Sequence, residues 1–192
     1  MSRVWLFGVG LVCGAVAMAL PGIVAHLRAA VHGGVVIQSS PGSARVHTEE
    51  KFAFTVRSPM EKVAPLFGAD KERVWAPGWE PQFAYPLPAA DVPGMVFTVA
   101  HGHKKAVWVN TQLDWKIGRV QYAYVIPEAM ATLITLQLAP NGSQTRVEVE
   151  YQRTALSAEA DEHVRALAEK DRAAGPEWEK QVNEYLKVEN GK

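Results

Sequence analysis

Hydrophobic and polar residues alternate through the middle of the chain, and this alternation predicts β-strands. Phe52, Phe54 and Val56 recur at every second position, a period that puts one face of a strand in the core and the other in water. Similar stretches follow at 94–101, 105–114, 118–126, 129–138 and 145–154. Asn141-Gly142 between the last two is the typical turn of a two-stranded hairpin. The pattern therefore predicts an antiparallel meander of about six strands.

Two short helices are expected after the first strand. Ser58-Pro59-Met60-Glu61 has the order of a helix start, with a capping hydroxyl, a proline at the first helical position and a glutamate three residues on. A second piece, residues 71–75, must end before Pro77-Gly78, which no continuous helix passes through.

The C-terminal region has the spacing of an amphipathic helix. We expect Ser157 to cap it, and apolar residues then recur on one stripe as far as Leu186. A helix of about 30 residues would span ~45 Å, enough to cross a whole sheet. Gly175-Pro176 should kink it or split it in two.

The N-terminal region is apolar. Residues 4–25 carry no charge, and an apolar segment of this length can cross a bilayer as a helix. Ala15-Val16-Ala17 would suit a signal-peptide cleavage site. We therefore expect residues 1–31 to be a signal anchor or a signal peptide, and residues 32–43, rich in Gly, Ser and Pro, to be a linker. Both alternatives place the domain at 44–189 outside the cytoplasm, anchored to a membrane or exported after cleavage.

Composition narrows the candidate chemistry. Lys and Arg together number 20, as do Asp and Glu. The sequence has no basic stripe of the kind that binds nucleic acid, so we expect no nucleic-acid partner. The single cysteine, Cys13, lies in the apolar N-terminal run. His101 and His103 are too few to form a zinc site, so we expect no metal and no other cofactor. No catalytic residue is assigned, because no recognisable pair forms among the ionisable candidates Asp70, Glu72, Arg73, Glu80, His101 and Asp114.

Three stretches, "FTVRSPMEKVAPLF", "VWAPGW" and "PEWEKQVNEYL", together with the order of elements, resemble the SRPBCC (START-like, polyketide cyclase/dehydrase and lipid-transport) superfamily. The resemblance covers residues 45–188. It implies an α+β helix-grip fold, in which a curved antiparallel sheet of six to seven strands wraps a long C-terminal helix, with two short helices after the first strand. It also implies a hydrophobic cavity between sheet and helix, used for ligand binding and only sometimes for chemistry.

Large aromatic side chains are the candidates for lining that cavity. Trp75, Trp79 and Phe83 lie in an irregular segment and either line the cavity mouth or plug it as core. Tyr122 and Tyr124 either orient the polar end of a ligand or reach solvent. The residues expected to bind the ligand are Trp75, Trp79, Phe83, Phe97, Val109, Tyr122, Tyr124 and Trp178.

These features favour binding or transport of a hydrophobic small molecule or lipid. One alternative is an enzyme, a cyclase or dehydratase acting on a polyketide-like substrate. A buried ionisable group at the cavity wall would favour it. The other is an interaction module with a solid core, which a cavity below about 300 Å³ would favour.

Overall fold

The computed structural model describes residues 44–189 and residue 191. The expected signal segment at 1–31 and the linker at 32–43 lie outside the described residues, so both stay predictions. Within the described part, no helix combines the length and the apolar character needed to cross a membrane.

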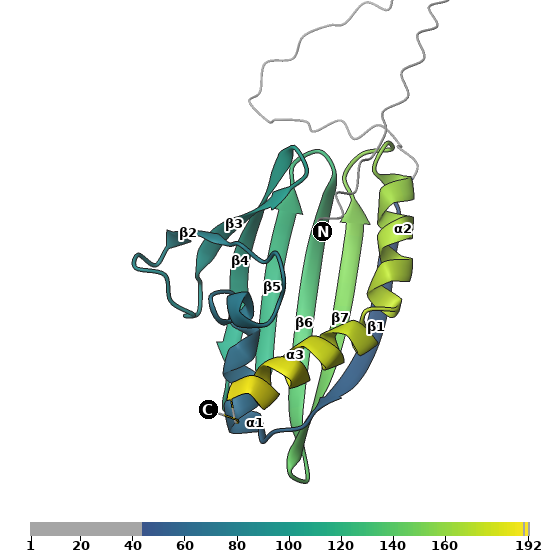
Figure 1. The fold of residues 1–192 in the computed structure, drawn as a ribbon. Coiled ribbons are helices and arrows are strands. Elements are labelled where there is room, and N and C mark those ends of the chain that lie inside the picture. Colours follow the sequence, from purple (N-terminus) through teal and green to yellow (C-terminus); the bar gives the residue numbers. More distant parts are fainter. Residues whose placement is uncertain (1–43, 190, 192) are drawn as a thin grey trace, which may run out of the picture. The chain divides into compact units, whose positions relative to one another are not determined.

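Seven strands form one antiparallel sheet (Figure 1). They are β1 (His47–Val56), β2 (Gln82–Tyr85), β3 (Val96–His101), β4 (Lys104–Asp114), β5 (Arg119–Ile126), β6 (Met130–Asn141) and β7 (Gln144–Ala155). Their order is β1-β7-β6-β5-β4-β3-β2. Consecutive strands from β2 to β7 are therefore neighbours, and β1 forms the edge of the sheet beside β7. The predicted meander is confirmed, and β2 is an additional strand that the pattern did not indicate.

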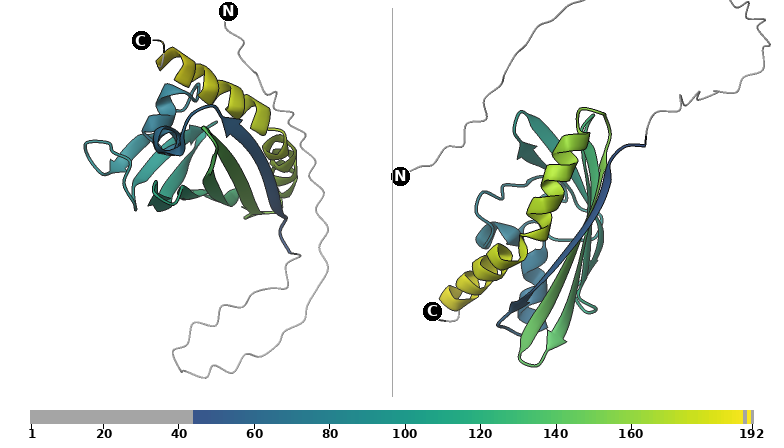
Figure 2. Two further views of the ribbon diagram at one scale, coloured as in Figure 1. Left: turned by 90° about the horizontal axis from the view of Figure 1, so that it is seen from below. Right: turned by 90° about the vertical axis from the view of Figure 1, so that its right-hand side faces the viewer.

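The helices lie on one face of the sheet, which curves around them (Figure 2). α1 (Met60–Val63), η1 (Ala64–Phe67) and η2 (Lys71–Val74) follow β1, as predicted. At the C-terminus, α2 (Asp161–Arg172) and α3 (Gly175–Glu189) replace one long helix. α2 and α3 separate where Gly175-Pro176 predicted a break. Proline is tolerated at the start of α3, because the N–H that it lacks would have no hydrogen-bond partner there.

The predicted caps of these helices are wrong. Ala160, not Ser157, precedes the first residue of α2, and no side chain caps α2. Pro59 occupies the corresponding position of α1, which also has no side-chain cap. Acidic Asp161 and Glu162 in the first turn of α2 instead complement the positive end of the helix dipole.

Hydrogen bonds between side chains and backbone hold α3 against the end of β1. Asn183 Nδ2 donates to the Thr55 carbonyl at 3.1 Å, and the Arg57 amide donates to Asn183 Oδ1 at 2.8 Å. The face of α3 toward the sheet buries Val182 and Leu186. α3 is therefore fixed in position above the sheet, so the space beneath it has a defined shape.

An aromatic cluster fills much of this space. The Trp178 ring of α3 lies with its centroid 5.5 Å from Phe52, 6.2 Å from Phe54 and 5.6 Å from Trp75. Trp75 keeps only 6% of its surface exposed. The irregular segment after η2 thus packs into the core, where burial does not require helical regularity.

The expected inward orientation of Val109 is wrong. Ala106 and Asn110 are buried on the inner face of β4 with Trp108 between them, whereas Val107 and Val109 are 43% and 37% exposed on the outer face. Val109 therefore cannot contact a ligand held beneath α3.

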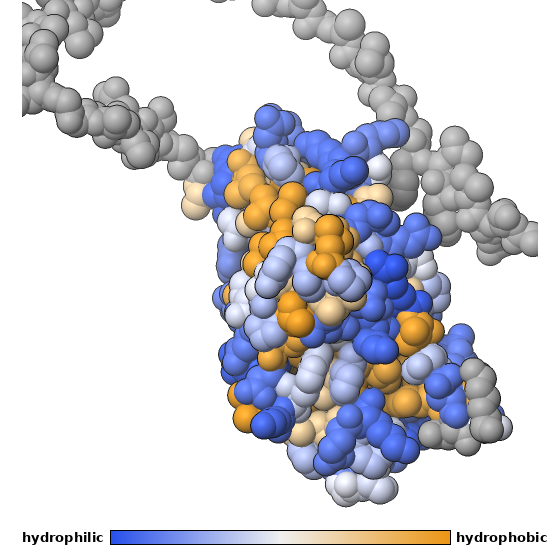
Figure 3. Space-filling model, turned by 90° about the vertical axis from the view of Figure 1, so that its left-hand side faces the viewer, coloured by the Kyte–Doolittle hydropathy of each residue, from blue (hydrophilic) through white to orange (hydrophobic). Residues whose placement is uncertain are grey.

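Figure 3 shows the β2 side of the molecule, where hydrophobic groups form separate patches among hydrophilic ones.

Candidate functional site

A recess of about 140 Å³ lies between the sheet, α3 and the segment that follows η2. Three groups of residues line it. Glu72, Trp75, Ala76 and Trp79 come from η2 and the segment after it; Phe97, Trp108, Tyr122, Ile134, Leu136 and Tyr151 come from β3 to β7; Trp178 and Gln181 come from α3. Several of these side chains are half-buried, so the recess is not a sealed void.

The structure brings together five of the eight residues predicted to bind a ligand. These five are Trp75, Trp79, Phe97, Tyr122 and Trp178. The others do not line the recess.

Two of the remaining three form a second layer behind it. Phe83 stacks on Phe97 with centroids 5.5 Å apart, and Tyr124 stacks on Trp108 at 4.1 Å. Val109 points away from the recess, on the outer face of β4.

Hydrogen bonds hold the aromatic walls in position. Trp75 Nε1 donates to the Leu66 carbonyl at 2.6 Å, and Trp79 Nε1 donates to the Ala69 carbonyl at 2.7 Å. The Tyr122 hydroxyl donates to the Phe67 carbonyl at 3.0 Å. All three acceptors lie in η1 or directly after it, so these side chains are anchored to one short stretch of backbone. This favours fixed walls over a mobile gate.

Glu72 supplies the only carboxyl among the lining side chains. Burial, the larger cause, and the charge of Asp91, the smaller one, together raise its pKa from an ordinary 4.5 to about 8. The Glu72 carboxyl makes no hydrogen bond or ion pair with any residue in the described range. At neutral pH this group is therefore mostly protonated, and it ionises near the pH at which a general base works best.

Asp91 is held beside η2 by the backbone. The amides of Asp70 and Lys71 donate to its two carboxylate oxygens at 2.8 and 3.1 Å. Its carboxyl also lies against Gly68, where a Cβ would overlap it. Burial raises the pKa of Asp91, while the two amide bonds lower it. These contacts fix the position of Asp91, and therefore its effect on the pKa of Glu72.

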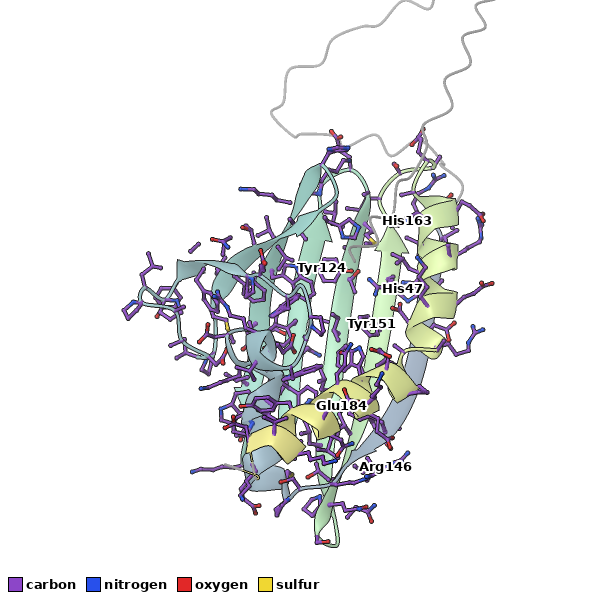
Figure 4. All side chains as sticks on the ribbon, viewed as in Figure 1. His47, Tyr124, Arg146, Tyr151, His163 and Glu184 are labelled. Atoms are coloured by element: carbon purple, nitrogen blue, oxygen red, sulfur yellow. The ribbon has the colours of Figure 1, made fainter. Side chains whose placement is uncertain are left out.

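A second buried polar cluster joins the sheet to α2. Arg153 on β7 forms a two-point ion pair with Asp171, with N–O distances of 2.5 and 2.8 Å. Its Nη1 also donates to the Tyr124 hydroxyl and, at 3.2 Å, to Thr132 Oγ1. The guanidinium carbon lies 4.5 Å from the centroid of Tyr151, which projects from the sheet with Tyr124 (Figure 4). This cluster fixes Tyr151, a wall of the recess.

The set of eight predicted residues omitted seven that line the recess: Glu72, Ala76, Trp108, Ile134, Leu136, Tyr151 and Gln181. Glu72 was one of the ionisable candidates, but nothing in the sequence distinguished it from Glu80. A tryptophan between two valines was the available signal for Trp108, because a bulky aromatic gains more from burial than valine does. Within residues 44–189 and 191, no three His, Cys, Asp or Glu side chains cluster to hold a metal.

Comparison with known proteins identifies the fold. No family model matches the chain, and no curated protein does. Solved structures with a similar fold include norcoclaurine synthase from Thalictrum flavum in complex with dopamine and hydroxybenzaldehyde (11% identity, 88% of this chain and 99% of that one, TM-score 0.56). Ara h 8.0201 is 11% identical over 74% of this chain and 99% of that one, with a TM-score of 0.53.

A third structure, the Mll3558 protein from Rhizobium loti, is 19% identical over 74% of this chain and 99% of that one, with a TM-score of 0.51. At these identities the likeness shows the fold alone. It agrees with the strand order and with the helices on the concave face. The chain has the helix-grip fold.

Proposed function

We propose that this chain binds a small aromatic or alicyclic molecule in the recess beneath α3. The observation that carries the proposal is an open space of about 140 Å³ with tryptophan, tyrosine and phenylalanine side chains around it. An apolar cavity of about 150 Å³ accommodates benzene. A ligand of one ring therefore matches the recess in size and in chemistry.

The size of the recess argues against a lipid ligand. Sites for drug-sized ligands usually measure about 300–1,000 Å³, and this recess is about 140 Å³. An acyl chain would require α3 or the loop after η2 to move. The proposal therefore narrows the expected ligand class to small ring compounds.

The small volume of the recess, taken alone, favours the alternative of an interaction module with a solid core. The position of Glu72 argues against such a core. Glu72 is half-buried and has no polar side-chain partner in the described range, so an apolar residue would suit a purely structural wall better. The structure of norcoclaurine synthase contains dopamine and hydroxybenzaldehyde, both single-ring aromatic molecules. This fold therefore accommodates ligands of the proposed size in at least one other protein.

Titration of the full-length protein with tert-butylbenzene, followed by tryptophan fluorescence, tests the proposal. We expect saturable quenching in the wild type. Ala76→Leu should weaken binding at least tenfold, because Ala76 lines the recess and a larger side chain fills it. Ala84→Leu, at an exposed position on β2, is the matched control and should bind as the wild type does. Equal affinity in all three proteins would contradict the proposal.

A second candidate function is acid–base catalysis by Glu72. Its support is a carboxyl at the wall of the recess with a pKa of about 8, since perturbed carboxyls are common at catalytic sites. A base at this position would remove a proton next to a carbonyl of a bound ketone. Incubation of acetophenone with the protein in D₂O would reveal this activity as deuterium at the methyl carbon, measured by NMR. Incorporation at the buffer rate, or at the same rate with Glu72→Gln, would exclude it.

A further inference from the structure

We propose that the recess binds a small organic cation, a compact ammonium group with a ring attached, and that Glu72 is its counter-ion. This inference rests on the proposed small-molecule site and specifies the charge of its ligand. It follows from the arrangement of the rings, from the charges around the recess and from the unpaired state of the Glu72 carboxyl.

Two pairs of tryptophans around the recess stand at steep angles, whereas Phe97 and Trp108 are inclined by 17°. Trp79 and Trp108 are inclined by 85° with centroids 5.3 Å apart, and Trp75 and Trp178 by 64° at 5.6 Å. These rings line one space, so a cation bound there would lie close to several indole rings. The face of an indole carries negative potential and attracts cations more strongly than that of any other side chain. A neutral ligand would use only the apolar surface of these rings.

The charges around the recess are of one sign. Among the lining side chains of the described chain there is no lysine, arginine or histidine, and Glu72 is the one acid. Asp91 adds a second negative charge close enough to raise the pKa of Glu72. Arg153, which lies over the ring of the lining residue Tyr151, is already paired with Asp171. A bound cation would therefore meet two carboxyl groups, and no cationic side chain among the residues that line the recess.

The Glu72 carboxyl has the properties that the counter-ion of a cationic ligand needs. It lies at the wall, has no hydrogen-bond or ion-pair partner among the described residues, and stays mostly protonated because ionisation there is costly. A cation in the recess would favour the ionised form, since an opposite charge nearby lowers the pKa of a carboxyl. Binding of a permanent cation at pH 7 should therefore release about one proton.

Other titratable groups around Glu72 do not obscure this signal. Asp91 belongs to the loop before β3, Tyr122 to β5 and Tyr151 to β7, while α3 faces the recess with the neutral Trp178 and Gln181. Burial raises the pKa of both tyrosines above the ordinary value, so neither ionises near neutral pH. Asp91 is held by the backbone amides of Asp70 and Lys71, and none of these three residues lines the recess.

Two probes of equal shape separate charge from size. Trimethyl(phenyl)ammonium and tert-butylbenzene have the same number of heavy atoms and differ in one unit of charge. In fluorescence titrations of the full-length protein at pH 8, we expect the cation to bind at least tenfold more tightly. Glu72→Gln should remove that preference. Glu80→Gln, an exposed carboxylate near the same segment, is the control and should keep the preference.

Calorimetry provides an independent readout. Because about one Glu72 in ten is ionised at pH 7 if its pKa is about 8, the affinity for the cation should rise about tenfold between pH 7 and pH 9. Titrations in buffers of different ionisation enthalpy should count about one proton released per cation at pH 7. Neither effect should occur in Glu72→Gln.

The outcomes distinguish this inference from the proposed function. If tert-butylbenzene binds and the cation binds no more tightly, the inference is wrong while the small-molecule site stands. A cation preference that survives Glu72→Gln would also overturn it. If neither probe binds, the proposed function fails as well.

Discussion

Replacing Glu72 by glutamine should change how stability depends on pH. Below pH 4.5 the carboxyl is protonated in both the folded and the unfolded chain. Between 4.5 and about 8 only the unfolded chain ionises, because burial and Asp91 keep the folded carboxyl neutral. The folded state then binds more protons than the unfolded state, so the free energy of unfolding falls as pH rises through this window. Glutamine cannot titrate and does not contribute this loss.

The structure gives the size of the effect. A rise in pKa from 4.5 to about 8 corresponds to a ceiling of about 5 kcal/mol at ~1.4 kcal/mol per pH unit. Because the recess is open to solvent, screening reduces this ceiling, and we expect roughly 2–3 kcal/mol. That is a large share of the stability of an ordinary domain.

Urea unfolding at pH 5 and pH 9 measures the effect as a difference between variants. Between these values, wild type should lose about 2–3 kcal/mol more than Glu72→Gln. Groups such as Asp91 and His101 titrate in both proteins and cancel in the comparison. Glu80→Gln should follow the wild type. Parallel curves for wild type and Glu72→Gln would show that Glu72 ionises normally, and both the catalytic and the counter-ion roles would lose their basis.

Three further substitutions test the packing of the domain. Asp171→Asn should cost about 3–5 kcal/mol in urea unfolding because it leaves the Arg153 charge buried without a partner, whereas Glu148→Gln in an exposed pair should cost below ~1 kcal/mol; equal losses would refute the distinction. Trp178→Ala should cost about 3 kcal/mol, and a loss under ~1 kcal/mol would show that the aromatic cluster contributes little. Gly118→Ala should cost at least ~2 kcal/mol more than Gly142→Ala, because both glycines have a positive φ but only at Gly118 would a Cβ overlap the Leu138 carbonyl; similar losses would mean that φ strain alone matters.

The sheet was predictable because alternation of apolar residues is a local signal. The short strand β2 was not, since its four residues lie between Pro81 and Pro86 and read as a loop. The error at Val109 has a specific cause. Leu113 packs on the core, and counting back by twos from it places Val109 inward, but a register shift between Asn110 and Gln112 reverses that parity. Trp108 takes the inner position instead.

The aromatic walls were partly predictable, while the carboxyl was not. Trp75 and Trp178 are large apolar side chains that any buried arrangement would use, so composition and spacing indicated them. The properties of Glu72 depend on Asp91, which lies on the loop before β3, and on Tyr122 and Tyr151, which come from distant strands. A raised pKa arises only when these segments assemble, so no local pattern in the sequence marks it.

The most direct test of a ligand site beneath α3 is a crystal structure of the protein grown with tert-butylbenzene. The account predicts electron density for one ring between Trp108, Tyr151 and Trp178, with α3 in place above it. Ligand density confined to the outer face of the sheet, or a recess closed by its own side chains in the presence of saturating ligand, would contradict it.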